Sequence, residues 1–207
     1  IFKKNVLSAV SKDDKLALVF SDNSSFIYSI KSHKPLFKHK NNEIITVDSK
    51  IAQPLFLNDL VLFPTLNGKV IIVNVNLKKV LKTMIISPEA DFNNVIYMNM
   101  ENNILIAATP VTLFTLNTQE HREELNIRDV KYIDDIIYVL TKEGKILTYD
   151  NKLKLIASKK FNFAYFVGWI IAKDKIYLFE NEKYVIVLDK NLSNPKVYNY
   201  YLNDEKV

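Results

Sequence analysis

The sequence predicts an all-β protein built from repeated four-stranded antiparallel sheets. Short apolar runs rich in Ile, Val, Tyr, Phe and Leu are bounded by Asn, Asp, Gly or Ser, which is typical of β-strands. No stretch keeps a helical period for three turns. Runs such as "DLVLF" and "DIIYVL" are apolar without alternation, which predicts strands buried on both faces. A radial stack of small sheets, each pressed between two neighbours, buries strands in this way, so we expect a β-propeller.

The repeat is clearest at two of the three glycines. "TLNGKVIIVNVNLKKVL" starts at Thr65 and "TKEGKILTYDNKLKLIA" starts at Thr141, with Gly68 and Gly144 at the turn between two apolar runs. A residue without a Cβ adopts positive φ most easily, so these glycines are expected to be structural turn residues. Alignment on the turn recovers three further copies, at a spacing of roughly 40 residues. At the turn these copies have Asn23-Ser24, Pro110-Val111 and Glu182-Lys183.

Each copy also has a leading strand before its apolar pair and a more polar outer strand behind it. Pro54 is expected in the second leading strand, at the innermost edge of its blade, where no ladder donor is needed. The five repeats are expected to form a single propeller domain or propeller segment, and five blades fit either a complete small ring or part of a ring of about six to eight blades. We favour the partial ring. The expected blades are residues 1–43, 44–88, 89–125, 126–161 and 162–207.

Composition and charge exclude several classes of function. The net charge is +5, but lysine supplies nearly all of the positive charge and is scattered among Asp and Glu, unlike the concentrated Arg-rich surface typical of nucleic-acid binding. The chain has no cysteine, which excludes disulfides, thiolate catalysis and Cys-based metal sites. The longest uncharged stretch, between Glu101 and Glu120, contains Pro110 and several polar residues, so no membrane span is expected. Any targeting signal is expected upstream of Ile1.

The repeat resembles the PQQ-type (pyrroloquinoline-quinone-like) propeller repeat. That pattern has an apolar strand, a short turn with Gly, a Lys-containing strand that ends in Asp, and a polar turn. The matching residues are Gly68, Lys69 and Asn74, then Gly144, Lys145 and Asp150, and then Leu188-Asp189. The resemblance is to the non-enzymatic, BamB-like members, which implies a periplasmic lipoprotein of the outer-membrane barrel-assembly type. It also implies an eight-bladed ring, more than this chain supplies.

Catalytic and cofactor chemistry is not expected. Quinone-dependent enzymes with similar repeats hold the cofactor between a Trp and a cystine, whereas this chain has one Trp and no Cys. The pairs Asp13-Asp14, Asp134-Asp135 and Glu123-Glu124 are candidate general acids and bases or calcium ligands. The two Asp pairs fall at one place in the repeat, so they are interpreted as turn residues. His33 and His39 flank an outer strand without a nearby carboxylate, so a metal site is not expected.

Four residues are candidates for partner binding. Lys69, Lys145 and Lys183 follow equivalent turns, and equivalent loops of successive blades open on one face of a propeller. Their ammonium groups are therefore candidates for an arc that faces an acidic partner, although turn lysines that only aid solubility are commoner. Trp169 is expected on the inner strand of the fifth blade, where core packing is the commoner role and docking the alternative.

The function that these features favour is a non-enzymatic scaffold that presents loops to a protein partner in the bacterial cell envelope. The first alternative is a ligand-binding or enzymatic propeller with its site at the central channel. The leading strands are almost wholly apolar there, which favours the scaffold. The second alternative is a cytoplasmic WD40-like scaffold. A signal peptide with a Cys at its cleavage point upstream of Ile1 would favour a lipid-anchored envelope protein, and its absence would favour the cytoplasm.

Overall fold

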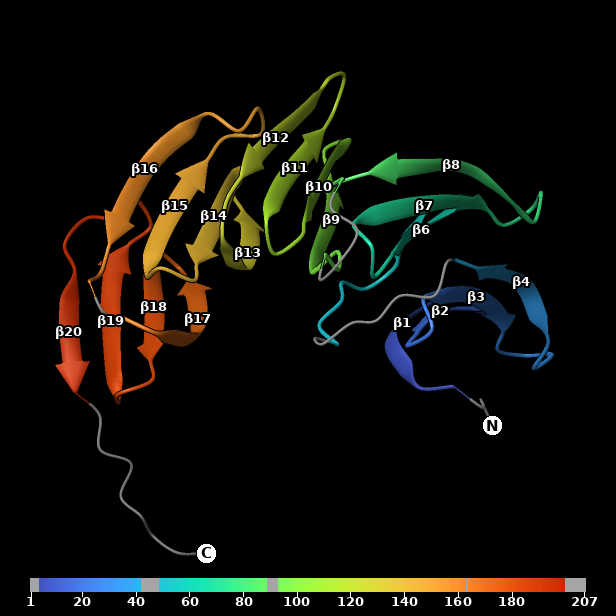
Figure 1. Cartoon of the computed structure of the whole chain (residues 1–207), viewed down its shortest axis with the longest axis horizontal. Coiled ribbons are helices and arrows are strands. Elements are labelled where there is room, and N and C mark those ends of the chain that lie inside the picture. Colours follow the sequence, from blue (N-terminus) through green and yellow to red (C-terminus); the bar gives the residue numbers. More distant parts are fainter. Residues whose placement is uncertain (1–3, 42–48, 89–92, 163, 200–207) are drawn as a thin grey trace, which may run out of the picture. The chain divides into compact units, whose positions relative to one another are not determined.

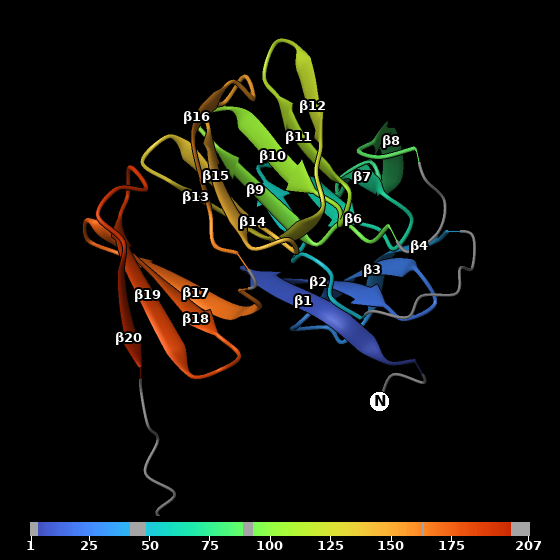
Figure 2. The same ribbon diagram turned by 60° about the vertical axis from the view of Figure 1, so that its left-hand side comes forward.

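The computed structural model describes residues 4–41, 49–88, 93–162 and 164–199. These residues form 20 strands and no helix. Each sheet has four strands in chain order, side by side in both ribbon views (Figure 1, Figure 2). The strands are β1 Val6–Lys12, β2 Lys15–Phe20, β3 Ser24–Ser29, β4 Pro35–Lys40, β5 Leu55–Leu57, β6 Leu60–Pro64, β7 Lys69–Asn74, β8 Lys79–Ile85, β9 Tyr97–Glu101, β10 Ile104–Ala108, β11 Thr112–Leu116, β12 Glu120–Glu124, β13 Ile127–Ile133, β14 Ile136–Thr141, β15 Lys145–Tyr149, β16 Leu155–Lys160, β17 Phe166–Ala172, β18 Lys175–Glu180, β19 Tyr184–Asp189 and β20 Lys196–Asn199.

The predicted all-β architecture of four-stranded sheets is therefore confirmed, with two local differences. Pro54 lies just before β5, so its expected place inside the leading strand is wrong. The expected fifth outer strand extends beyond Asn199, and residues 200–202 lie outside the described residues. Tight turns join the first two strands of each sheet. Asp or Asn residues adopt the positive φ in four of these turns, with values of 52° at Asp134 and 60° at Asp135, and Lys173 adopts it in the last sheet with 51°.

The chain divides into two compact units, residues 1–129 and 130–207, with the boundary inside β13. In the first unit, one apolar cluster packs β2 and β3 against β6 and β7 and includes Val19, Ile27, Val61 and Phe63. A second cluster joins the next two sheets through residues such as Val70 and Phe114. In the second unit an apolar cluster packs the sheets of β14–β15 and β17–β19 together. Sheets thus pack face to face through apolar side chains within each unit.

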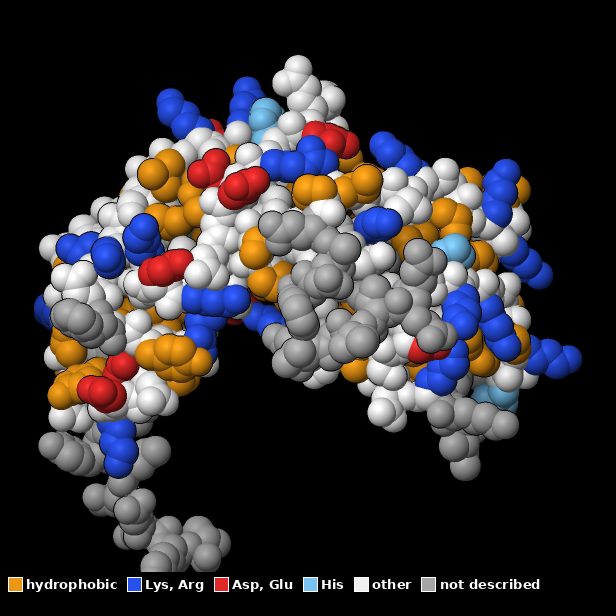
Figure 3. All heavy atoms as spheres, in the orientation of Figure 1, with side chains coloured by type: hydrophobic (Ala, Val, Ile, Leu, Met, Phe, Trp, Pro, Cys, Tyr) orange, Lys and Arg blue, Asp and Glu red, His pale blue; other side chains and the backbone are white. Residues whose placement is uncertain are grey.

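The middle strands are buried as their apolar sequences predict. All five residues of β10 are buried, and β6 and β14 are buried except at their first residue. The exception is β18, in which buried and half-buried residues alternate. Ile176 and Leu178 face the apolar cluster of the second unit, while Tyr177 and Phe179 point to the other face and stay partly exposed. The outer strands are the most polar, and Lys and Arg side chains gather over β4 and β8 in the space-filling view (Figure 3).

Candidate functional site

The turn between the second and third strands is fixed in each sheet by a side-chain oxygen. The Thr65 hydroxyl accepts a hydrogen bond from the backbone N–H of Lys69 at 2.9 Å, and the Thr141 hydroxyl accepts one from Lys145 at 3.1 Å. The Thr109 hydroxyl accepts from the N–H of Thr112 at 3.1 Å. These bonds satisfy backbone donors that no strand pairs, and they place a lysine at the first residue of β7 and of β15.

Acidic residues replace threonine in the first and fifth sheets. An Asp22 oxygen accepts from the N–H of Ser24 at 3.2 Å, and a Glu180 oxygen accepts from the N–H of Glu182 at 2.6 Å. Burial alone would raise the pKa of Asp22, but hydrogen bonds from Lys4 and Ser24 leave it below its ordinary value. Carboxylates at this point therefore stabilise the turn.

Two of these turns accept only glycine. Gly68 and Gly144 have φ of 70° and 76°. A Cβ on Gly68 would lie 2.8 Å from the Ser87 carbonyl oxygen, and one on Gly144 would lie 2.7 Å from the Phe161 carbonyl oxygen. At the matching positions Asn23 and Lys183 adopt φ of 63° and 68°, so the positive φ recurs in turns without glycine.

The three candidate lysines lie at the same turn of the repeat, where Lys69 and Lys145 begin β7 and β15 but Lys183 precedes β19 and takes the place of the turn glycine. Lys69 and Lys145 are half-buried and Lys183 is exposed. Among the described residues, none of the three takes part in an ion pair. Lys69 lies in the first unit, whereas Lys145 and Lys183 lie in the second unit. An arc formed by all three stays a prediction.

Trp169 lies on β17, the leading strand of the last sheet, and is 6% exposed. Its side chain belongs to the apolar cluster of the second unit, and the Lys131 ammonium lies 5.4 Å from the centre of its ring. A partner would reach little of this ring, so the structure favours packing as its main role.

The remaining residues of the repeated motif, Asn74, Asp150 and Asp189, lie at the turn between the third and fourth strands of their sheets. The side-chain amide oxygen of Asn74 accepts from the N–H of Leu77 at 2.8 Å, and an Asp150 carboxylate oxygen accepts from the backbone N–H groups of Lys152 and Lys154, each at 2.9 Å. Asp189 holds the corresponding turn in the last sheet. The Asn and Asp residues of the motif therefore accept hydrogen bonds in the turn that joins the third strand to the fourth.

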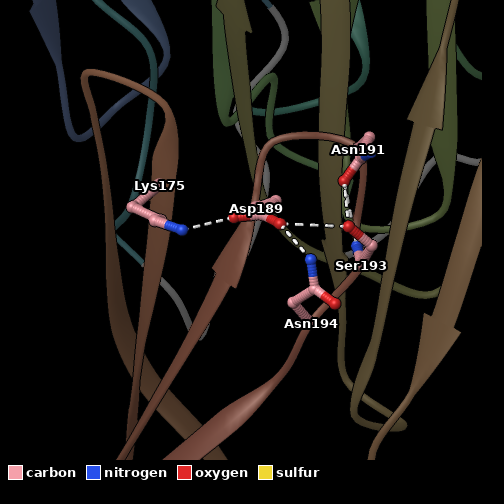
Figure 4. A network of polar contacts seen from close by, with 5 residues as sticks. All are labelled: Lys175, Asp189, Asn191, Ser193 and Asn194. Carbon is pink, nitrogen blue, oxygen red and sulfur yellow. Dashed lines mark hydrogen bonds and ion pairs between the residues drawn. The ribbon is translucent and has the colours of Figure 1, made fainter.

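Asp189 is the most strongly held of these residues (Figure 4). Its carboxylate accepts hydrogen bonds from the Lys175 ammonium, from the Asn194 amide at 2.7 Å and from the Ser193 hydroxyl at 3.1 Å. The Lys175 bond, followed by those of Asn194 and Ser193, lowers the pKa of Asp189 from 3.8 to about 2. The Asp189 carboxylate therefore stabilises a turn at the surface.

The aspartate pairs lie in the first turn of their sheets, which confirms the turn interpretation. The Asp14 oxygens accept from the backbone N–H of Lys31 and the hydroxyl of Ser29, both at 2.7 Å, and these bonds lower its pKa. Asp134 pairs with Lys190 at 2.7 Å. Within the described residues no group of three or more His, Cys, Asp or Glu is placed to hold a metal ion. The same residues contain no helix able to cross a membrane.

A pocket that the sequence did not indicate lies beside the Lys183 turn. Its volume is about 350 Å³, and it lies where the residues after β16 meet the β18–β19 turn in the second unit. Both oxygens of the buried Glu180 are engaged there, by the N–H groups of Tyr165 and Glu182. No sequence signal marks the pocket, because its walls come from two repeats. The lining residues are Phe161, Asn162, Ala164, Glu180, Glu182, Tyr184, Ile186 and Val197.

Solved structures with the same arrangement of sheets are β-propellers. BamB from Moraxella catarrhalis superposes with a TM-score of 0.76 at 13% identity, over 92% of this chain and 60% of that protein. The C-terminal WD40 domain of Sif2 superposes with a TM-score of 0.74 at 13% identity, over 99% of this chain and 62% of that one. These matches show that the fold is that of propeller blades.

Relatives in sequence come from two Helicobacter pylori strains, in which the protein is called plasminogen-binding protein PgbB. Identity is 34% over 188 residues for one strain and 33% over 188 residues for the other. The alignments cover 89% of this chain but only 35% and 34% of the relatives, so the chain spans about a third of their length. No family model matches the sequence.

Proposed function

We propose that this chain is a non-enzymatic propeller scaffold that binds a protein partner, and that plasminogen is the first partner to test. The observation that carries the proposal is the 34% identity to a plasminogen-binding protein across 89% of the chain. The fold supports the same role, because propellers present loops on a rigid framework. The shared region covers a third of those relatives, so plasminogen binding by this region is part of the proposal.

The contacts that we propose are made by three lysines at the turns between second and third strands, Lys69 in the first unit and Lys145 and Lys183 in the second. The backbone N–H groups of Lys69 and Lys145 donate to threonine hydroxyls, and that of Lys183 donates to the Glu180 carbonyl oxygen. No described carboxylate forms an ion pair with their ammonium groups. Exposed charges at the rim of an interface mainly set the association rate and its salt dependence. The partner surface should therefore be acidic. Trp169 supports this framework from the core.

The test compares two triple variants with the same change of net charge. One replaces Lys69, Lys145 and Lys183 by Glu. The matched control replaces three exposed lysines of the outer strands β8 and β16, Lys79, Lys82 and Lys160. Biosensor binding to immobilised plasminogen should fall about tenfold or more for the first variant and little for the control. Equal loss in both variants would refute the three turn lysines as contacts, and no binding by the wild-type chain would refute plasminogen as its partner.

A second candidate is a scaffold of outer-membrane protein assembly, as in BamB-like proteins. The superposition on BamB with a TM-score of 0.76 favours it. Under this proposal the protein is periplasmic and anchored to the outer membrane by a lipid upstream of Ile1. Fractionation of cells that express the full gene, with globomycin to block lipoprotein processing, tests both points. A cytoplasmic protein that ignores the inhibitor would contradict this candidate and favour the WD40-like alternative.

The single-domain organisation of residues 1–207 is also a proposal. The five expected repeats would unfold together if their sheets share one continuous core. Calorimetry should then show one transition whose van't Hoff and calorimetric enthalpies agree. Two separate transitions, assigned to residues 1–129 and 130–207 by limited proteolysis, would show two domains instead.

A further inference from the structure

A second pocket lies in the first unit, where the residues that follow β8 meet the β10–β11 turn and the end of β12. Its volume is about 340 Å³. It occupies the same step of the repeat as the pocket beside Lys183, since both join the exit of one sheet to the second turn of the next. Acidic and hydrophobic side chains adjoin over this end of β12 (Figure 3). The lining residues are Ser87, Pro88, Val111, Thr112, Glu124, Leu125 and Asn126.

The walls of the pocket are fixed by backbone hydrogen bonds. The N–H of Ser87 donates to the Gly68 carbonyl oxygen at 3.2 Å, and the N–H of Leu125 donates to the Val111 carbonyl oxygen at 3.0 Å. The next residue but one, Ile127, donates to the Pro110 carbonyl oxygen at 2.8 Å. These bonds tie both sheets to their turns, so the pocket is formed before any ligand arrives.

Ser87 is the unusual residue of this pocket. It is 2% exposed, and its hydroxyl oxygen has no hydrogen-bond partner among the residues that the structure describes. A buried hydroxyl without a partner lowers the stability of the folded protein, and such groups are rare enough to need an explanation. Its place in the lining of the pocket supplies one, because a bound group would complete its hydrogen bonding.

The carboxylate of Glu124 adds negative charge at the end of β12, where it is exposed to solvent. Arg122, two residues earlier on the same strand, does not supply the counter-charge. Its guanidinium pairs with Glu120 at 2.9 Å and donates to the Ile85 carbonyl oxygen at 2.8 Å. The pocket therefore offers a carboxylate and a hydroxyl as acceptors, beside the apolar side chains of Pro88, Val111 and Leu125.

We propose that this pocket binds a lysine or arginine side chain from a partner protein. The apolar stem of the side chain would lie against Pro88, Val111 and Leu125, and its cationic end would donate to Glu124 and to the Ser87 hydroxyl. Long cationic side chains combine an apolar stem and a charged end in this way. An acidic side chain would be repelled by Glu124, and a purely apolar one would leave both acceptors unsatisfied. The site is distinct from the turn lysines Lys69, Lys145 and Lys183, and the proposal does not depend on which protein is bound.

The comparison with the pocket in the second unit supports this choice of site. That pocket has carboxylates too, but both oxygens of Glu180 are already used by backbone N–H groups. At the equivalent step of the first unit the turn is held by Thr109, so the Glu124 carboxylate is not needed to build it. The Glu124 carboxylate in the lining of the Ser87 pocket is therefore available to a ligand.

The test uses four capped tripeptides, N-acetyl-Ala-Xaa-Ala-amide, with Lys, Arg, norleucine or Glu at the centre. Binding is followed by the NMR shifts of the backbone amides of Ser87, Val111 and Leu125 in the whole chain. The Lys and Arg peptides should give saturable shifts there, norleucine should bind about tenfold more weakly, and Glu should not bind. Shifts confined to other residues, or equal affinity for Lys and norleucine, would overturn the proposal.

Two variants and a matched control separate this site from a structural role. Glu124→Gln should weaken the Lys peptide about tenfold, whereas Glu123→Gln, the neighbouring carboxylate outside the lining, should leave its affinity unchanged. Ser87→Ala should weaken the same peptide and raise the Tm of the free protein by about 2–4 °C, because it removes the unpaired hydroxyl. A fall in Tm for Ser87→Ala, or equal effects of the two Glu variants, would refute the assignment. Neither result depends on plasminogen binding.

Discussion

Replacement of Gly144 by Ala should destabilise the second unit by an amount that the turn geometry predicts. Gly144 has φ of 76°, and an Ala residue in the left-handed region costs about 1–2 kcal/mol. The new Cβ would lie 2.7 Å from the Phe161 carbonyl oxygen and 2.9 Å from that of Ala164. Both are backbone atoms, and Phe161 also donates its N–H to the Gly144 carbonyl oxygen at 2.9 Å. Loss of that bond adds about 1 kcal/mol, so the free energy of unfolding should fall by about 2–3 kcal/mol.

Urea unfolding followed by the fluorescence of Trp169 measures this change in the second unit. The midpoint should fall by about 1–2 M at an unchanged m-value. Gly168→Ala is the matched control, because no atom lies within 4 Å of its added Cβ, and it should be neutral or stabilise by up to about 1 kcal/mol.

A third variant separates the two causes. Gly144→Asn tolerates positive φ, as Asn23 does with φ of 63° at the matching turn, and should fall between the other two variants. If Gly144→Ala and Gly168→Ala had the same midpoint, the argument from φ and from the close carbonyl oxygens would be wrong.

Three further predictions concern the second unit. Asp189→Asn should lower the unfolding midpoint above pH 4; because the folded pKa is about 2 against an ordinary 3.8, the wild-type advantage should shrink as pH falls through that range, and a difference that persists at pH 2 would contradict this. Trp169→Ala should cost about 3–5 kcal/mol by thermal unfolding, with partner binding retained by Trp169→Phe, whereas loss of binding in a stable Phe variant would show a docking role. Thr141→Val should cost about 1–2 kcal/mol by urea unfolding and Thr141→Ser much less, and equal costs would show that the hydrogen bond to Lys145 is unimportant.

The local parts of this structure follow from sequence because each rests on a few neighbouring residues. Asp134 and Asp135 adopt the positive φ of a tight turn, and Thr141, Gly144 and Lys145 form a turn whose hydrogen bonds lie within five residues. Strands between such turns pair with their neighbours in chain order, so the four-stranded sheet is encoded in one repeat. The prediction for Pro54 was wrong because the strand begins directly after it, at Leu55. Strand ends depend on pairing rather than on composition.

Sequence alone thus determined the strands, their order and the turn residues, since short-range hydrogen bonds and backbone preferences decide them. Only the tertiary structure decided which groups are left available to a partner. The burial of Trp169 and the unpaired hydroxyl of Ser87 each arise where residues from two repeats meet, and Glu180 is engaged by Tyr165, which lies 15 residues earlier in the chain. Glu124 looked like half of an acidic pair in the sequence, and the packing of two sheets places it beside Ser87 in a pocket. Packing between repeats joins residues far apart in the chain, and no local pattern records those contacts.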